Sequence, residues 1–360
     1  NWFIRDWTNP WPLHIPKFAI CGGNWHAKRP TCEPPRSKMP LIKWPCATAT
    51  WGSFRKNFGE GVAPSEPQYF SGHGSYGASP SREQRSKMRI TLAICLALLF
   101  TINGSAQNWP QFRGEQAAGT GSGNPPVEWN VETGENVKWK VAIEGLGHSS
   151  PVVWGDHVFL TTAVNTETAE PTLQTGWLGG TGKAAEDEGD WKWQVICLDM
   201  NDGTVRWTED VRTGQPEIKR HLKASHANCS VATDGEHIVA FFGSEGLFCF
   251  NLSGDLIWEK NFGRLHSGPY NAEKLEWGFA SSPVIHDGRV IVQCDCLNTA
   301  FLAVLDIESG DELLRIDREG EVATWSSPTI VETDERTQIV CNGYRQMAGY
   351  DFETGEQLWT

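Results

Sequence analysis

Short apolar runs separated by polar turns recur along the C-terminal part of the chain, and residues 326–360 show the pattern most completely. An apolar run follows a Ser-Pro pair, two more runs lie at residues 338–341 and 348–352, and the segment closes on a Leu-Trp pair. Apolar runs of about four to eight residues that are bounded by turn residues are typical of β-strands. Residues 326–360 are therefore predicted to form four short strands joined by turns.

The same order of features occurs three more times upstream, and two anchors place the four copies in register. The opening anchor is a serine that is followed by proline or valine. The closing anchor is an aspartate or asparagine, then a turn with glycine, then a strand that ends in a large apolar residue. The opening serines are Ser150, Ser230, Ser282 and Ser327. The closing anchors are Asp199, Gly203 and Trp207; Asn251, Gly254 and Trp258; Asp306, Gly310 and Leu314; and Asp351, Gly355 and Trp359.

Each closing anchor has a simple physical basis. Aspartate or asparagine starts a turn by accepting hydrogen bonds from backbone N–H groups, and glycine adopts the positive φ that the turn needs. Tryptophan is large enough to pack against a neighbouring sheet.

The closing residues are 51, 56 and 45 residues apart, near the roughly 40–50 residues of a propeller blade. We predict an all-β fold, a β-propeller of four-stranded antiparallel blades; the alternative is a β-sandwich with chance internal similarity.

The segments around the repeats complete the predicted domain organisation of residues 107–360. Residues 107–134 form a polar lead-in that is rich in glycine and proline, and residues 135–360 form the propeller. Its first strand, at residues 136–143, carries Trp139 and resembles the closing strand of a further blade. The first full copy is lengthened by an insertion at residues 164–193, which contains Glu186, Asp187, Glu188 and Asp190. We interpret this insertion as an acidic solvated loop, with a contact surface as the alternative.

A targeting segment precedes the propeller. A short basic stretch at residues 87–89 leads into an apolar run at residues 90–102, and small residues follow up to Ala106. This is the layout of a secretory signal peptide, and the run is shorter than the roughly 20 residues of a membrane span. We therefore expect a signal peptide at residues 88–106, a secreted or periplasmic location, and no stable membrane span.

Residues 1–87 differ from the rest of the chain in charge and in pattern. They hold 12 basic and 5 acidic residues, against 19 and 39 in the remainder, and they show no helical or alternating period. We interpret them as a disordered or misassigned extension. The alternatives are a basic, tryptophan-rich binding arm and a metal site. The candidate ligands of that site are Cys21, His26, Cys32 and Cys46, whose spacing matches no compact zinc pattern.

Residues 107–360 resemble the secreted PQQ-like (pyrroloquinoline-quinone-like) β-propeller repeat proteins. The resemblance is carried by the Trp-Pro-Gln-Phe-Arg-Gly sequence at residues 109–114, by residues 148–153, 243–247 and 280–284, and by the closing anchors. Propellers of this family usually close with seven or eight blades. The resemblance therefore implies that about four blades of an incomplete propeller are present, and that missing blades or another chain complete it.

Composition and cysteine placement narrow the chemistry. The formal net charge of −13 disfavours nucleic acid as a partner, because an acidic surface repels phosphates. Six cysteines in the propeller permit disulfides, but their positions in strand-like runs also suit small apolar core residues. Cys294 and Cys296 point to one face of a strand, so metal or redox use of this pair is an alternative.

The resemblance to quinoprotein dehydrogenases implies PQQ with calcium, a catalytic aspartate and an adjacent cysteine pair. Here Asp295 separates Cys294 from Cys296, and the segment from Asp199 to Gly203 is better interpreted as a blade turn than as a calcium loop. We therefore expect no catalytic residue, no metal ligand and no cofactor. A PQQ-dependent dehydrogenase with calcium is the alternative.

The residues just before each opening strand lie, in a propeller, at the mouth of the central channel. Aromatic and imidazole groups that converge there can bind a small ligand or a peptide, or they can simply pack the loops. The candidates are His148, His226, Asn228, Trp277 and Trp325. We predict a non-catalytic binding or scaffold module whose partner is an unknown protein or small molecule. The further alternative is a peptide-docking or sensor propeller of the cell envelope.

Overall fold

The structure is a computed structural model that describes residues 2–4, 107–168, 173–174, 176 and 182–360. These residues belong to one compact unit, which spans residues 1–15 and 103–360. The predicted signal peptide and the cysteines of the N-terminal extension lie outside the described residues. Within the described ranges, no helix has the length and hydropathy that crossing a membrane requires.

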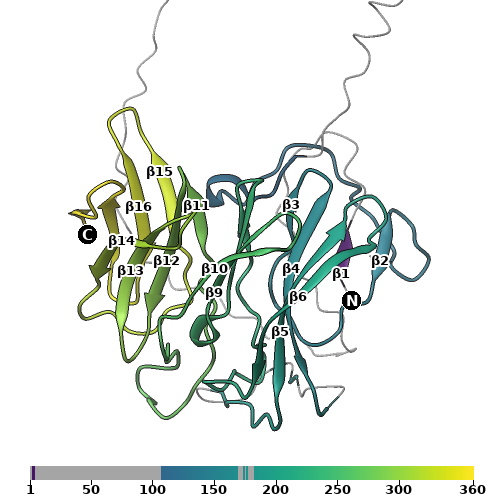
Figure 1. The fold of residues 1–360 in the computed structure, drawn as a ribbon, viewed down its shortest axis with the longest axis horizontal. Coiled ribbons are helices and arrows are strands. Elements are labelled where there is room, and N and C mark those ends of the chain that lie inside the picture. Colours follow the sequence, from purple (N-terminus) through teal and green to yellow (C-terminus); the bar gives the residue numbers. More distant parts are fainter. Residues whose placement is uncertain (1, 5–106, 169–172, 175, 177–181) are drawn as a thin grey trace, which may run out of the picture. The chain divides into compact units, whose positions relative to one another are not determined.

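Four antiparallel sheets of four strands make up the fold, and the strands of each sheet follow chain order (Figure 1). We call these sheets blades 1 to 4. Blade 1 contains β3 (Val152–Trp154), β4 (His157–Asn165), β5 (Trp191–Asp199) and β6 (Val205–Gly214), and blade 2 contains β7 (Ala232–Thr233), β8 (His237–Phe241), β9 (Leu247–Asn251) and β10 (Leu256–Lys260). Blade 3 contains β11 (Val284–His286), β12 (Arg289–Asp295), β13 (Ala300–Asp306) and β14 (Glu312–Asp317), and blade 4 contains β15 (Thr329–Glu332), β16 (Thr337–Asn342), β17 (Met347–Asp351) and β18 (Gln357–Trp359). The prediction of an all-β fold, an incomplete β-propeller with four four-stranded blades, is confirmed.

The remaining elements are short. β1 (Trp2–Ile4) pairs antiparallel with β2 (Trp139–Val141), which occupies part of the strand predicted at residues 136–143. Two 3₁₀ turns, η1 (Glu115–Ala117) and η2 (Gly243–Glu245), complete the elements. The part of the chain that the structure describes contains no α-helix.

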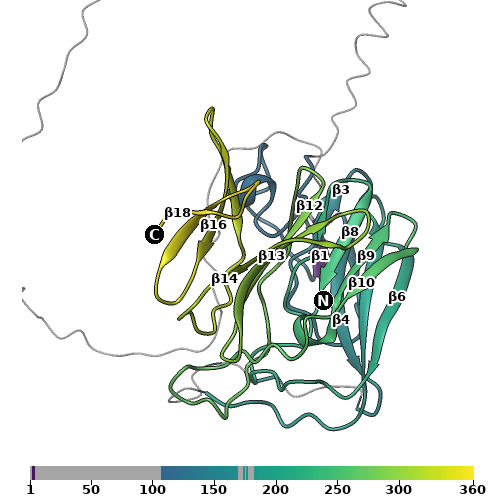
Figure 2. The ribbon, with the colours of Figure 1, turned by 60° about the vertical axis from the view of Figure 1, so that its left-hand side comes forward.

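Consecutive blades lie side by side (Figures 1 and 2). The hydrophobic cores lie between neighbouring blades. Successive side chains of a strand point to opposite faces of its sheet. One face of a blade therefore packs against the preceding blade and the other face against the following blade. The buried pairs that represent these cores are Phe159 and Ile238 between blades 1 and 2, Val239 and Val292 between blades 2 and 3, and Val304 and Ile339 between blades 3 and 4. Stacking therefore buries both faces of blades 2 and 3.

The closing tryptophans join consecutive blades at the glycine turns. The indole Nε1–H of Trp139 donates to the Met200 carbonyl oxygen at 2.9 Å, and its ring covers Gly203, where a Cβ would lie 2.5 Å from the ring. Trp207 and Trp258 repeat this contact on the turns of blades 2 and 3, with Nε1 to carbonyl distances of 3.0 and 2.6 Å. Glycine suits these positions for two reasons. The tryptophan ring leaves no room for a Cβ, and the glycine of each turn has a positive φ.

The fourth closing tryptophan behaves differently. At Gly355 two aliphatic side chains of blade 3 take the place of tryptophan: Ile316 lies 2.9 Å and Leu314 3.6 Å from the position of a Cβ. Trp359 lies instead over Gly349 of its own blade, and its Nε1 donates to Gln338 Oε1 at 2.8 Å. The outer face of blade 4 therefore has 42% of this indole exposed.

The opening serines form a ladder of hydrogen bonds across the blades. The backbone N–H of Ser150 donates to Ser230 Oγ at 2.9 Å, that of Ser230 to Ser282 Oγ at 3.0 Å, and that of Ser282 to Ser327 Oγ at 2.9 Å. The ladder fixes the first strands of all four blades beside one another. We call the end of the blades where these serines lie the mouth.

Candidate functional site

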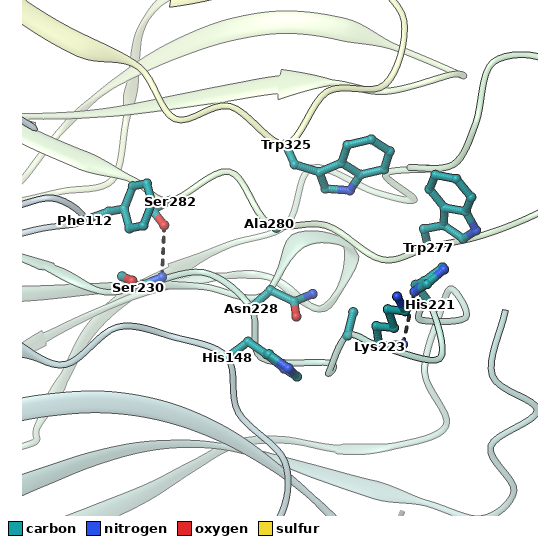
Figure 3. Close-up of a pocket in the computed structure, with 11 residues that line it drawn as sticks. Phe112, His148, His221, Lys223, Asn228, Ser230, Trp277, Ala280, Ser282 and Trp325 are labelled. Carbon is teal, nitrogen blue, oxygen red and sulfur yellow. Dashed lines mark hydrogen bonds between the residues drawn. The ribbon is translucent and has the colours of Figure 1, made fainter. Parts of the chain in front are cut away.

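A cavity of about 550 Å³ opens at the mouth (Figure 3). Its wall combines residues from the loops before all four blades with Phe112 of the lead-in segment. The lining residues are Phe112, His148, His221, Lys223, Ala224, Asn228, Ser230, Trp277, Ala280, Ser282 and Trp325. Small-molecule sites are commonly about 300–1,000 Å³ in volume, so this cavity has the size of a ligand site.

Four of the five predicted site residues line this cavity. His148 precedes blade 1, Asn228 precedes blade 2, Trp277 precedes blade 3 and Trp325 precedes blade 4. His226 does not line it, because its side chain is 5% exposed and packs edge-on against the Trp191 ring. Binding of a ligand by these residues stays a prediction.

One part of the wall is aromatic. Figure 3 shows the side chains of Trp277 and Trp325 near each other. Their rings lie 5.7 Å apart at an angle of 30°, and His221 meets Trp277 edge-on at 5.2 Å. The Trp325 indole is held by a hydrogen bond from its Nε1 to the Gly278 carbonyl oxygen at 2.8 Å, yet 38% of the side chain stays exposed. Exposed flat rings of this kind offer a stacking surface to an aromatic or apolar group.

The amide of Asn228 joins two loops of the mouth. Its Oδ1 accepts hydrogen bonds from the backbone N–H and the Oγ of Ser225 at 3.0 and 3.1 Å. Its Nδ2 donates to the Phe279 carbonyl oxygen at 3.0 Å, across to the loop before blade 3. An amide nitrogen has two N–H groups, so one donor of Asn228 is left for a ligand.

The titratable groups of the wall are basic. Burial and then the positive charge of Arg220 lower the pKa of His148, and burial and then Lys223 lower the pKa of His221. Since an ordinary histidine pKa is about 6.5, both imidazoles are mostly neutral at pH 7. Lys223 then supplies the charge of the wall, and no carboxylate is found among the described residues that line it. The cavity therefore favours an anionic group.

A buried ion pair fixes the loop that carries His221 and Lys223. The Nε and Nη2 groups of Arg220, whose side chain is fully buried, donate to the two oxygens of Asp187 at 2.7 Å each. His226 Nε2 lies 3.1 Å from Asp187 Oδ2. Burial raises the pKa of Asp187, but the hydrogen bonds from His226 and Arg220 outweigh it and hold the pKa below its usual value.

This ion pair changes the interpretation of the insertion at residues 164–193. The Asp187 side chain is 12% exposed, so the expectation of an acidic solvated loop is wrong for this residue. The expectation holds for Glu186, whose side chain is 79% exposed and pairs with Lys219. The difference arises because the segment at residues 183–185 forms backbone hydrogen bonds with residues 220–222, which turns Asp187 inward.

A second buried ion pair supports the loop before Trp325. Arg318 Nε and Nη2 donate to Asp295 at 2.7 and 3.1 Å, and both side chains are no more than 1% exposed. Arg318 Nη1 also donates to the Tyr350 hydroxyl of blade 4 at 2.7 Å. The sequence analysis missed both pairs. The positions of the arginines alone could have been noticed, because Arg220 and Arg318 stand ten and nine residues before opening serines.

The residues at hand do not fit a calcium-dependent quinone site. Calcium prefers six to eight oxygen ligands, whereas the described lining residues supply no carboxylate. No group of three or more histidine, cysteine or acidic side chains in the described part of the chain could hold a metal ion. The segment from Asp199 to Gly203 does not offer a calcium loop either. Its Asp199 carboxylate accepts hydrogen bonds from Arg206 and from the backbone N–H of Asn201.

The propeller cysteines are buried thiols. All six are free, including Cys294 and Cys296. Burial raises the pKa of Cys296 to about 12 and that of Cys294 well above its usual value. Because the thiolate is the reactive form, this burial favours the interpretation of these cysteines as small core residues over redox use.

Three solved structures that are similar to the chain are one BamB protein and two quinohemoprotein alcohol dehydrogenases. BamB from Moraxella catarrhalis is 15% identical, with a TM-score of 0.32 over 60% of this chain and 62% of that one. The quinohemoprotein alcohol dehydrogenase of Comamonas testosteroni is 15% identical, with a TM-score of 0.39 over 71% of this chain and 41% of that one. The quinohemoprotein alcohol dehydrogenase ADHIIG of Pseudomonas putida is 14% identical, with a TM-score of 0.41 over 70% and 39%. The chain thus spans less than two thirds of the length of each.

The sequence itself matches one protein family. No curated protein matches the chain. The family model described as outer membrane protein assembly factor BamB matches residues 113–268 and, again, residues 249–360. These matches cover more than half of the chain and coincide with the four blades. The chain therefore belongs to the BamB family of PQQ-like β-propeller repeat proteins.

Proposed function

We propose that the chain is a non-catalytic binding or scaffold module and that its partner docks at the cavity of the mouth. The observation that supports this most is the cavity wall, to which loops before all four blades contribute. A partner group that combines an aromatic or apolar body with a negative charge suits the wall, because two neighbouring indoles lie there together with Lys223. Such a group could belong to a small molecule or to a protein segment.

The chemistry of the wall supports binding rather than catalysis. Nucleophilic catalysis uses a hydroxyl or thiol within hydrogen-bond reach of a base. The hydroxyl oxygens of Ser230 and Ser282 instead accept backbone N–H groups of the serine ladder. Among the lining residues that the structure describes, no hydroxyl is hydrogen-bonded to an imidazole. A PQQ-dependent dehydrogenase is disfavoured because the described lining residues supply no carboxylate to hold calcium.

The proposed setting is the cell envelope. The family is described by the name of an outer membrane assembly factor, and residues 88–106 have the layout of a signal peptide. Both support a secreted or periplasmic location with a protein as partner. A peptide-docking role is thus the second form of the same proposal.

We also propose that further blades or another chain cover the outer face of blade 4. Trp207 and Trp258 each lie on the turn of the following blade, whereas Trp359 folds back onto Gly349. A neighbouring blade with an aspartate–glycine turn would offer Trp359 the carbonyl oxygen that the other tryptophans use.

A fluorescence titration tests the binding site. The probe is 8-anilinonaphthalene-1-sulfonate, an anionic aromatic dye, added to the full chain and to the variants Trp325→Ala, Lys223→Ala and His148→Ala. We expect one saturable site in the unchanged chain and binding at least about tenfold weaker in the first two variants, because each loses a stacking or charge contact. The control is Leu313→Ala, an exposed apolar residue of β14 outside the cavity. Absence of saturable binding, or equal affinity in all variants, would contradict the proposal.

A further inference from the structure

We infer that Asp187 and Asp295 are positioning residues that hold two separate parts of the cavity wall in place for the partner. This inference rests on the proposed function of the cavity. Neither carboxylate lines the cavity, and neither belongs to a repeat anchor. Each acts through a buried arginine on a loop that does line it.

The loop between β6 and β7 needs such support. It spans residues 215–231, contains no strand or helix, and carries His221, Lys223 and Asn228 to the cavity. A loop of this length without secondary structure stays in one conformation only when other contacts fix it. Two side chains of this loop, Arg220 and His226, contact Asp187, and backbone hydrogen bonds with residues 183–185 add to this support.

Asp187 grips the loop on both sides of Lys223. Its two oxygens accept hydrogen bonds from Arg220, at 2.7 Å each, before the lysine. One of them also lies 3.1 Å from the imidazole of His226, after the lysine. Arg220 Nη1 donates to the Ala224 carbonyl oxygen at 2.9 Å, which closes the turn between these two points.

Asp295 holds the other loop in an equivalent way. Its side chain accepts two hydrogen bonds from Arg318, and its Oδ2 also accepts one from the Thr324 hydroxyl at 3.3 Å. The backbone N–H of Thr324 donates to the Asp295 carbonyl oxygen at 3.2 Å. Thr324 directly precedes Trp325, so Asp295 fixes the backbone next to Trp325 and thereby the position of its indole.

The two Asp–Arg pairs occupy equivalent positions in blades 1 and 3. Asp187 lies between β4 and β5, and Asp295 ends β12, so each aspartate sits at the mouth, near the connection of the second and third strands. Each arginine follows the fourth strand of the same blade. Removing one member of a buried ion pair leaves an unpaired charge that cannot reach water. The loop should therefore rearrange locally, and its part of the wall should move with it.

Hydrogen exchange followed by mass spectrometry tests the inference without a ligand. The full chain is compared with Asp187→Asn, Asp295→Asn and the control Glu186→Gln, which removes a neighbouring exposed carboxylate. We expect Asp187→Asn to speed exchange at least about tenfold in residues 219–228 and to leave residues 318–326 unchanged. Asp295→Asn should do the reverse, and Glu186→Gln should change neither.

Either of two results would overturn the inference. One is unchanged exchange in the loop next to the substituted aspartate. The other is equally faster exchange in both loops, which would indicate general destabilisation. Asp187→Glu, which keeps the charge, should restore most of the protection. Should Asp187→Asn not fold, His226→Phe keeps the ring against Trp191 and removes only one contact of Asp187. It should then speed exchange in residues 224–228, and unchanged exchange there would contradict the role of Asp187.

The dye titration separates this inference from the proposed function. We expect Asp187→Asn and Asp295→Asn each to weaken dye binding about fivefold or more, with Glu186→Gln like the unchanged chain. Unchanged affinity in both asparagine variants, while Lys223→Ala loses binding, would overturn the positioning role and leave the proposed function standing. No saturable binding in the unchanged chain would instead contradict the proposed function, and the exchange experiment would still decide the role of the aspartates in the loops.

Discussion

The two ends of the blades are built by different means. Because successive strands run in opposite directions, the turn between the third and fourth strands lies at the end opposite the mouth. At that end, the same kind of turn, begun by aspartate or asparagine and containing glycine, meets a large apolar side chain at each junction. At the mouth, loops of different length and composition meet, and buried Asp–Arg pairs hold two of them. Repetition thus builds the scaffold, and irregular loops build the candidate site.

The largest expected effect tests the docking of tryptophan at the closing end. Trp258 is 9% exposed and packs between two blades, so Trp258→Ala should lower the free energy of unfolding by about 3–5 kcal/mol. Trp359 is 42% exposed and contacts only its own blade, so Trp359→Ala should cost roughly 0.5–1 kcal/mol. Urea denaturation of both variants measures the difference. Equal costs would mean that docking on the next blade does not distinguish the two tryptophans.

A smaller effect isolates the glycine beneath the ring. Gly310 and Gly288 have nearly the same φ, +72° and +69°, but a Cβ at Gly310 would lie 2.6 Å from the Trp258 ring. A Cβ at Gly288 meets no described atom within 4 Å. Gly288→Ala should therefore cost only the conformational strain, about 1–2 kcal/mol, and Gly310→Ala about 1–3 kcal/mol more. The same cost for both substitutions in urea denaturation would refute the steric role of the tryptophan.

The smallest expected effect separates the two ends by pH. Burial lowers the pKa of His226 at the mouth, so the unfolded chain binds a proton that the folded chain does not. This part of the stability is complete above the unfolded pKa of about 6.5 and is lost as the pH falls below it. Backbone hydrogen bonds lower the pKa of Asp306 and Asp351 in the closing turns. Their contribution is present above the unfolded aspartate pKa of about 3.9 and is lost only as the pH falls through the lower folded value.

Denaturation midpoints between pH 7.5 and 5 measure this difference. The midpoint of the unchanged chain should fall over this range. His226→Phe should reduce the slope, because it removes one of the three histidines at the mouth whose pKa is lowered, the others being His148 and His221. Asp306→Asn should leave the slope as it is. An unaltered slope in His226→Phe would contradict the contribution of His226 to the acid sensitivity of the mouth.

The sequence predicted the turns at the end opposite the mouth, because all the residues that form each turn lie close together along the chain. The aspartate, the glycine and the large apolar residue follow one another along the chain, and the steric demand of a turn is local. The predicted order of four strands in each copy is confirmed for the same reason. The contact of Trp359 differs from those of Trp139 and Trp207, although all three stand in similar sequence surroundings.

The candidate site was only partly predictable. Position before an opening serine identified His148 and Trp325, because that position places a residue at the mouth in every blade. The same rule misplaced His226, since the sequence does not tell which of two neighbouring polar residues will turn towards Asp187. The Asp–Arg pairs join residues 23 to 33 positions apart, and no local pattern specifies such a pairing.

Hydrogen exchange of the unchanged chain, with and without saturating 8-anilinonaphthalene-1-sulfonate, tests the central claim most directly. The account predicts that the dye slows exchange in residues 219–228, 277–280 and 324–326 at the mouth, and leaves the closing turns at residues 199–204 and 306–311 unchanged. Slower exchange in the closing turns, or no slowing at the mouth, would contradict the assignment of the binding site to the irregular end of the blades.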